Sequence, residues 1–133
     1  MNAPYSIGID VGGTKTALGL FASDGVLIER TQYPSNKTAE PEAFFDELAE
    51  HCKKLIQSQN LTVKDLDGIG IGMPSFVLFS EGRILKTSNL TNIRDFPARD
   101  YFSERFENAV RIVIDNDAHT GALAEFRHGA GQG

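Results

Sequence analysis

The sequence of 133 residues lacks the features that define several protein classes. Its one cysteine, Cys52, excludes an internal disulfide and a cysteine-rich metal site, and it lies in an apolar helical pattern typical of a buried, inert thiol. No basic segment with a long apolar run follows Met1, so no signal peptide is predicted. No stretch approaches the roughly 20 apolar residues that a membrane span needs. We therefore expect a cytoplasmic protein with no membrane partner.

Positive charge is also scarce. The chain has 13 Lys and Arg against 18 Asp and Glu, which gives a formal net charge of -5. A nucleic-acid interface needs clustered Lys and Arg, so no nucleic-acid partner is expected. The three histidines (His51, His119 and His128) show no metal-ligand spacing with carboxylates or the cysteine. The 41% of apolar residues and the chain length are typical of one soluble globular domain.

Apolar periodicity predicts a mixed α/β sheet. Alternating apolar residues predict three early strands joined by glycine turns, over Tyr5–Val11, Lys15–Phe21 and Val26–Tyr33. The period then becomes helical over Pro41–Gln59. Downstream we expect a strand over Gly68–Pro74, a hairpin over Phe76–Thr87 and a polar loop over Ser88–Pro97. A short helix over Arg99–Glu107, a strand over Val110–Ile114 and an alanine-rich helix over Asn116–His128 are expected to follow. Early antiparallel strands followed by alternating helices and strands indicate this architecture.

The segment "IGIDVGGTKTALGLF" raises the question of a phosphate site. Gly8 and Gly13 have the separation of a Walker A motif, but Thr14 stands where that motif requires lysine, and a strand follows instead of a helix. The dinucleotide pattern G-x-G-x-x-G is also absent. What remains is a glycine hairpin directly after an aspartate, Asp10.

Such a hairpin has two interpretations. Glycines allow backbone N–H groups to approach an anion, and threonine hydroxyls and a lysine add donors and positive charge. Asp10 would repel a phosphate unless a cation lies between them, and Mg²⁺ bound through water suits that role. The candidate phosphate-binding residues are Asp10, Gly12, Gly13, Thr14, Lys15 and Thr16. The plainer interpretation is a hairpin turn with solvated Thr and Lys side chains.

Two further segments carry polar or glycine-rich patterns. "GIGIGMP" places Gly68, Gly70 and Gly72 on one face of a strand, which favours either close ligand approach or tight packing. "VRIVIDNDAHTGALAEF" places Asp115, Asn116 and Asp117 where a strand leads into a helix. One of these three residues would suffice as a helix cap. Asp117 is therefore also a candidate general base, with Asn116 orienting the same substrate.

Together these segments resemble the ROK family of sugar kinases and sugar-responsive repressors, within the actin-like ATPase superfamily. The resemblance rests on "IGIDVGGTKTALGLF", on "GIGMP" with the later "SNL", and on "IDNDAHTGALAEFRHGAG", which occur in family order. It implies a ribonuclease-H-like lobe, built on a five-stranded mixed sheet in the order 3-2-1-4-5 with helices packed on it. It further implies an ATP-dependent kinase acting on a hexose or amino sugar, with Mg²⁺.

The resemblance also implies residue roles. Asp10, Gly12, Gly13, Thr14 and Lys15 match the family's first phosphate motif. Asp117 matches the base that accepts a proton from the attacking sugar hydroxyl. Asn116 matches a sugar ligand, and Asn89 is a further candidate sugar ligand.

The chain departs from the family pattern in three respects. Ser75 stands where glycine is frequent, and His119 where many members have asparagine, so the identity of the sugar stays open. The family's second lobe, with its second phosphate motif, adenosine site and Cys/His zinc motif, has no counterpart in residues 1–133. We therefore expect an N-terminal lobe that is inactive or nearly so by itself.

Other functions remain open at this point. A sugar-sensing regulator of the same family would carry a DNA-binding domain before the first strand, where only Met1–Pro4 stand. A kinase of a neighbouring branch, such as the N-acetylglucosamine or BadF-type kinases, would share "GGTKT". A non-catalytic, self-associating lobe would pair through apolar surface left exposed without a second lobe. Homo-oligomers are possible under each hypothesis.

Overall fold

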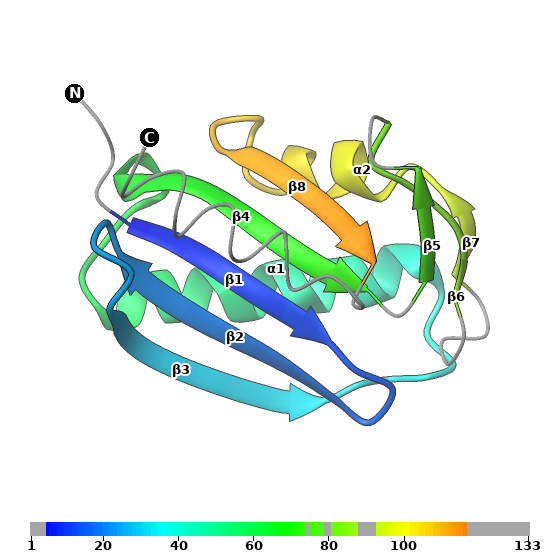
Figure 1. The fold of residues 1–133 in the computed structure, drawn as a ribbon, viewed down its shortest axis with the longest axis horizontal. Coiled ribbons are helices and arrows are strands. Elements are labelled where there is room, and N and C mark those ends of the chain that lie inside the picture. The colour runs from blue at the N-terminus through cyan, green and yellow to red at the C-terminus, as the bar shows by residue number, and fades with distance from the viewer. Residues whose placement is uncertain (1–4, 74, 79–80, 88–92, 117–133) are drawn as a thin grey trace.

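The computed structural model describes residues 5–73, 75–78, 81–87 and 93–116, and Figure 1 shows how they are arranged. The main sheet has five strands in the order β3-β2-β1-β4-β8. Its strands are β1 (Tyr5–Val11), β2 (Lys15–Ala22), β3 (Leu27–Pro34), β4 (Leu66–Met73) and β8 (Arg111–Asn116). With β8 as the fifth strand of this sheet, the predicted order 3-2-1-4-5 is confirmed.

Strand direction divides the main sheet into two parts. β1, β2 and β3 form an antiparallel meander, whereas β4 and β8 run parallel to β1. The turn between β2 and β3 uses Asp24 and Gly25, and Gly25 has a φ of 88°, which glycine adopts without strain. The Asp24 carboxylate also accepts the Val26 N–H at 3.1 Å. The glycine turn predicted between these two strands is confirmed.

The amphipathic helix α1 (Pro41–Ser58) covers one face of this sheet (Figure 1). Pro41 stands in its first turn, where the missing N–H costs no hydrogen bond. The apolar side chains that recur every three or four residues are buried: Phe44, Phe45, Leu48, Ala49, Cys52, Leu55 and Ile56. They pack in one core with the apolar side chains of the strands. Burial raises the pKa of the Cys52 thiol above its usual range, as expected for an inert core cysteine.

A second, three-stranded sheet stands beside the carboxyl ends of β4 and β8. It contains β5 (Ser75–Leu78), β6 (Arg83–Thr87) and β7 (Arg94–Phe96) in that order. The β5–β6 hairpin was expected, but β7 lies in the segment predicted as a polar loop. β7 is a strand because Phe96 is buried and stacks on Phe45 of α1, with ring centroids 5.7 Å apart. Its three residues are too few for an alternating pattern to be visible in the sequence.

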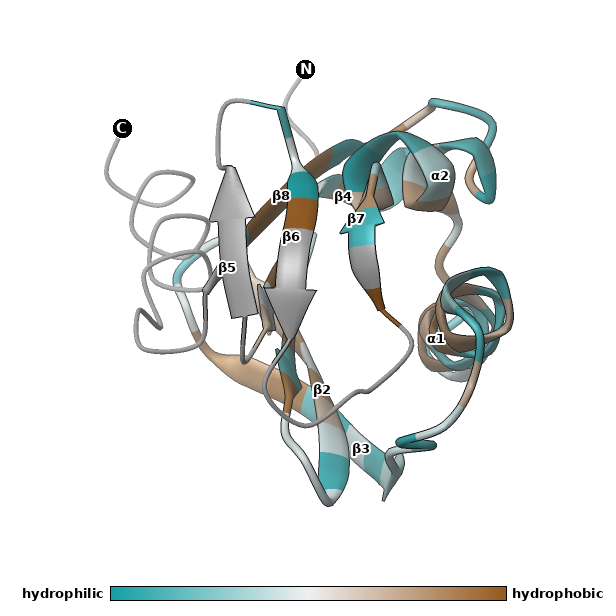
Figure 2. Cartoon of the chain, turned by 90° about the vertical axis from the view of Figure 1, so that its right-hand side faces the viewer, coloured by the Kyte–Doolittle hydropathy of each residue, from teal (hydrophilic) through white to brown (hydrophobic). Residues whose placement is uncertain are grey.

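The short helix α2 (Ala98–Glu104) lies on the same side of the main sheet as α1 (Figure 2). The sequence predicts this helix to Glu107, but α2 ends at Glu104 and tightens into turns, in which each N–H from Arg105 to Glu107 donates to the carbonyl three residues earlier. The positive φ angles of Glu107 and Asn108, 56° and 57°, then prevent the helix from resuming. A single 3₁₀ turn over Val63–Asp65 leads into β4. Asn116, predicted to begin a helix, is the last residue of β8, and the rest of that predicted helix lies outside the described residues. Among the described helices, none is long and apolar enough to cross a membrane.

Candidate functional site

The glycine hairpin lies at the carboxyl end of β1. The Gly12 N–H donates to the Lys15 carbonyl at 2.8 Å and closes the turn into β2. A Cβ on Gly12 would lie 2.8 Å from that same carbonyl oxygen, so any larger residue would push the turn open. The turn therefore requires glycine at position 12. Thr14 and Lys15 are exposed, which leaves both side chains accessible to a ligand.

Asp10 stands just before this hairpin on the face of the sheet opposite α1. In the registers of β1, β4 and β8, Asp10 lies beside Gly72, and Gly72 lies beside Asp115. Because neighbouring strands are about 4.8 Å apart, the two aspartates are roughly 10 Å apart along this row. Gly72 places no side chain between them.

These three strands are parallel, so their carboxyl ends share one edge of the sheet (Figure 1). β1 is also the point at which the topology reverses: β2 and β3 extend on one side, and α1 crosses over to β4 on the other. Ligands of open α/β sheets bind at such a reversal, outside the carboxyl ends of the strands. The sequence pattern alone indicates no role for Asp115, because its alignment with Asp10 depends on the register of three separate strands.

A shallow groove of about 220 Å³ runs along this face of the sheet. Its lining includes Asp10 and the neighbouring β2 residue Ala17, together with Gly8, Leu18, Gly19, Phe21, Leu27 and Arg30. A Cβ on Gly19 would lie 2.9 Å from the Phe21 ring, so this glycine makes room for an aromatic side chain. At Gly19, tight packing and not ligand approach accounts for the glycine.

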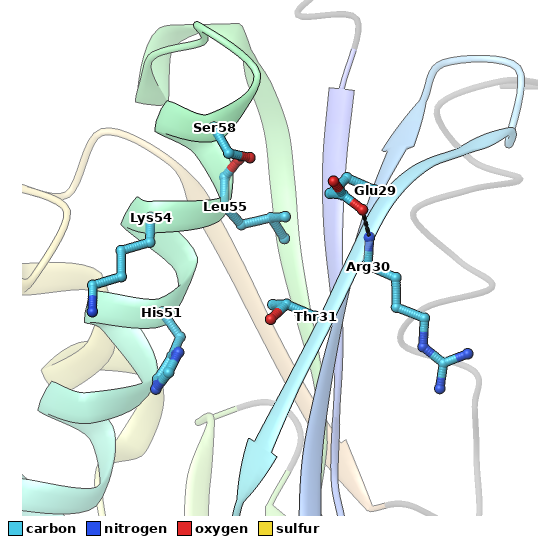
Figure 3. Close-up of a pocket in the computed structure, with 7 residues that line it drawn as sticks. All are labelled: Glu29, Arg30, Thr31, His51, Lys54, Leu55 and Ser58. Carbon is cyan, nitrogen blue, oxygen red and sulfur yellow. Dashed lines mark hydrogen bonds between the residues drawn. The ribbon is translucent and has the colours of Figure 1, made fainter.

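A second cavity, of about 280 Å³, lies between α1 and the edge strand β3 (Figure 3). Its lining residues are Glu29, Arg30, Thr31, His51, Lys54, Leu55 and Ser58, none of them a predicted site residue. Leu55 extends from the helix toward the strand, whereas the Lys54 side chain points away from the strand and the Arg30 side chain points to the other side of the sheet. The cavity is on the face opposite Asp10, so it is not part of the predicted phosphate site.

Thr16 differs from the other predicted phosphate ligands. Its side chain is fully buried and points to the α1 side of the sheet, opposite to Asp10. Its hydroxyl lies 2.8 Å from the hydroxyl of Ser35, and Ser35 also donates to the Gly12 carbonyl at 2.8 Å. In this geometry the Thr16 hydroxyl is not available to a phosphate. Ser35 was missed by sequence analysis because its partners lie 19 and 23 residues earlier in the chain.

Tyr33 is a buried core residue next to the hydrogen bonds of Thr16 and Ser35. It pairs with Thr16 in the β2–β3 register, and its ring stacks on His51 with centroids 3.8 Å apart. Burial, and then the nearby charge of Glu47, raise the pKa of the Tyr33 hydroxyl above its usual range. The hydroxyl therefore stays protonated and neutral, as a core group should.

Of the predicted sugar-binding and catalytic residues, only Asn116 lies within the described ranges. Asn116 is the last residue of β8, opposite Met73 of β4. Asn89, Asp117 and His119 lie outside the described residues, and Ser75 begins β5. Over the described ranges, no three His, Cys, Asp or Glu side chains gather in a way that could hold a metal ion. The structure thus brings together Asp10, the glycine hairpin and the end of β8.

Comparison with known proteins adds three findings. The profile of the ROK family matches residues 6–133. Over all 133 residues the chain is 32% identical to a glucokinase of Halalkalibacterium halodurans, of which it covers 39%. Over 119 residues, 89% of this chain, it is 38% identical to an N-acetyl-D-glucosamine kinase of Salmonella gallinarum, of which it covers 36%.

A similar solved structure is that of a ROK family glucokinase from Streptomyces griseus in complex with glucose and AMPPNP. It is 29% identical and superposes with a TM-score of 0.72, over 97% of this chain and 38% of that one. The chain therefore spans well under half the length of each of these three proteins.

Proposed function

Because the chain belongs to the ROK family, we propose that it is the N-terminal lobe of an ATP-dependent sugar kinase, with the second lobe lying beyond residue 133. The proposal rests on one observation: Asp10 and the glycine hairpin lie at the shared carboxyl edge of β1, β4 and β8. Phosphoryl transfer needs mainly positioning and neutralisation of charge, and a glycine turn with Lys15 beside a carboxylate supplies both.

We assign the phosphates of ATP to the hairpin. The Gly12 N–H closes the turn on the Lys15 carbonyl, so the N–H groups assigned to the phosphates are those of Gly13 and Thr14 at its tip, and the exposed Lys15 adds positive charge. Thr14 adds a hydroxyl donor. Thr16 ends the motif, with its side chain buried beneath it.

Mg²⁺ fits the remaining group, Asp10. This ion usually keeps several waters and is held by one or two carboxylates together with substrate phosphates. Asp10 is an exposed carboxylate next to the phosphate hairpin, so it would hold Mg²⁺ through water while the phosphates complete the shell. When bound, Mg²⁺ would neutralise charge on the phosphates of ATP.

The sugar is assigned to the edge beside β8. Asp117 follows Asn116, the last residue of β8, directly in the chain. A carboxylate there would accept the proton of the sugar hydroxyl as it attacks the γ-phosphorus, with Asn116 and Asn89 binding the sugar. Relatives named as glucokinases and N-acetyl-D-glucosamine kinases support a hexose or amino sugar. We expect the reaction to take place in the cytoplasm.

The test is a phosphorylation assay of the full-length protein with Mg·ATP and a panel that includes glucose, N-acetylglucosamine and other hexoses. ATP-dependent formation of a sugar phosphate with at least one of them is expected. A full-length protein that phosphorylates none of them would contradict the proposal.

A self-associating, non-catalytic lobe would then be the better account. One observation favours that second candidate: three apolar side chains that lead into the edge strand β3 are exposed, Val26 by 55%, Leu27 by 47% and Ile28 by 42%. Such a lobe would form dimers or larger species as its concentration rises.

A further inference from the structure

A short hydrogen-bond network connects the phosphate hairpin to the residue that follows β3. The Ser35 hydroxyl donates to the Gly12 carbonyl at 2.8 Å, and the Ser35 N–H donates to the Thr14 carbonyl at 2.9 Å. The hydroxyls of Ser35 and Thr16 lie 2.8 Å apart. One residue outside the hairpin thus contacts three residues within it.

The direction of these bonds follows from proton count. A serine hydroxyl has one hydrogen, and that of Ser35 is used toward Gly12. The Thr16 hydroxyl must therefore donate to Ser35, so its own hydrogen is also used inside the protein. Thr16 is fully buried on the side of the sheet away from Asp10. Both hydroxyls support the hairpin from beneath and do not face a ligand.

The hairpin needs such support. Gly12 and Gly13 carry no side chains, so they restrict the backbone less than any other residues would. A loop that is ordered only by its ligand weakens binding, because ordering costs entropy when the ligand binds. The bonds from Ser35 to the carbonyls of Gly12 and Thr14 hold the turn at two points independently of any ligand.

We propose that Thr16 and Ser35 are positioning residues, which hold the Gly12–Lys15 turn in its ligand-ready conformation. This inference rests on the proposed kinase function, because it assigns the turn to the phosphates of ATP. It differs from the sequence-based prediction for Thr16, in which the threonine hydroxyl binds phosphate directly. The two hypotheses predict different behaviour of the variants.

Hydrogen exchange of backbone amides in the 133-residue protein measures the support itself. Ser35→Ala should increase exchange of the Gly12 amide about fivefold, the effect of losing one ordinary hydrogen bond. Ser35→Thr keeps a hydroxyl and should restore slow exchange. Ser58→Ala is the matched control, because Ser58 also donates to a backbone carbonyl, that of Leu55 at 2.7 Å, but lies at the end of α1. Unchanged Gly12 exchange in Ser35→Ala would overturn the inference.

Steady-state kinetics of the full-length protein measure how the support of the turn affects the binding of Mg·ATP. Ser35→Ala should raise KM for Mg·ATP about fivefold and leave KM for the sugar unchanged, whereas a general loss of folded protein would lower the apparent kcat and change neither KM. Thr16→Val should have the same effect, and the double variant should be no worse than either single one, because both act through one network. Thr16→Ser should retain the wild-type values.

The outcomes separate the hypotheses. Additive effects of Thr16→Val and Ser35→Ala would show that Thr16 contacts the phosphate independently, and would overturn the inference. Wild-type KM values in Ser35→Ala would also overturn it while leaving the kinase proposal intact. A wild-type protein that phosphorylates no sugar would overturn the kinase proposal, and this inference with it, whatever the exchange rates.

Discussion

The chemistry proposed for this protein depends on two aspartates, Asp10 near the end of β1 and Asp117 directly after β8. Asp117 follows the end of β8, and we propose that it accepts the proton of the sugar hydroxyl. In the full-length protein, Asp117→Ala should lower kcat by roughly 10²- to 10⁴-fold, the usual contribution of general base catalysis. The measurement is a steady-state assay, with the melting temperature of each variant recorded as a control. A residue that only capped a helix would cost about 1 kcal/mol of stability and leave kcat nearly unchanged.

Asp10 has the second role, that of holding Mg²⁺ through water. Asp10→Asn keeps the size of the side chain and removes its charge, so the fold should persist while the Mg²⁺ concentration needed for half-maximal activity rises. Asp10 is exposed on the sheet surface, which is why we expect little loss of stability. The matched control is Asp24→Asn, an exposed aspartate of the β2–β3 turn on the same meander. An unchanged Mg²⁺ requirement in Asp10→Asn would contradict the assigned role.

At the scale of elements, the packing of aromatic side chains holds the second sheet and α2 against α1. Phe45 of α1 is fully buried and lies next to Phe96 of β7 and Phe102 of α2, with ring centroids 5.7 and 6.2 Å apart. Phe45→Ala should lower the free energy of unfolding by about 3–5 kcal/mol, because a cavity would form where three elements meet.

The measurement is urea unfolding followed by circular dichroism. Phe45→Leu, which keeps most of the volume, should lose clearly less stability than Phe45→Ala. Exposed Glu42 on the same helix offers the control substitution Glu42→Ala, which should stay within about 0.5 kcal/mol of the wild type. Equal stability of Phe45→Ala and wild type would show that this aromatic cluster does not join the elements.

The elements with a long apolar period were predictable from the sequence, and the short ones were not. α1 buries the residues that its periodicity indicates, and β1 and β4 follow the alternation of Ile and Gly residues. The sequence does not indicate β7, because its three residues carry no pattern of their own and depend on pairing with β6 and on the contact of Phe96 with Phe45 of α1, which is distant in sequence. The end of α2 was missed because the positive φ of Glu107 and Asn108 leaves no sequence signal as clear as glycine.

The candidate site also contains some features that the sequence predicts and others that depend on contacts distant in sequence. Asp10 and Gly12 carry a local pattern, and the structure places them at one turn. The alignment of Asp115 with Asp10 and the bonds of Ser35 depend on strand register and on the path of the chain after β3. Contacts of that kind have no local pattern, so only the folded structure identifies them. The roles proposed for Asn89 and Asp117 stay predictions.

At the scale of the whole molecule, the chain covers only 36–39% of the length of the two kinases and the solved glucokinase structure to which it was compared. One edge of its sheet carries the proposed phosphate hairpin, Asp10 and the end of β8. We propose that a second lobe supplies the adenosine site and the rest of the phosphate contacts. A kinase site shared between two lobes should not function when one lobe is alone.

The measurement that tests the central claim most directly is the rate of phosphoryl transfer from Mg·ATP to the preferred sugar, compared at equal concentration for the full-length protein and the 133-residue chain. We expect steady turnover by the full-length protein. We expect a rate for the 133-residue chain that is not distinguishable from a protein-free reaction, although circular dichroism shows it folded. Steady ATP-dependent sugar phosphorylation by the 133-residue chain would contradict the account, because the lobe would then contain a complete active site.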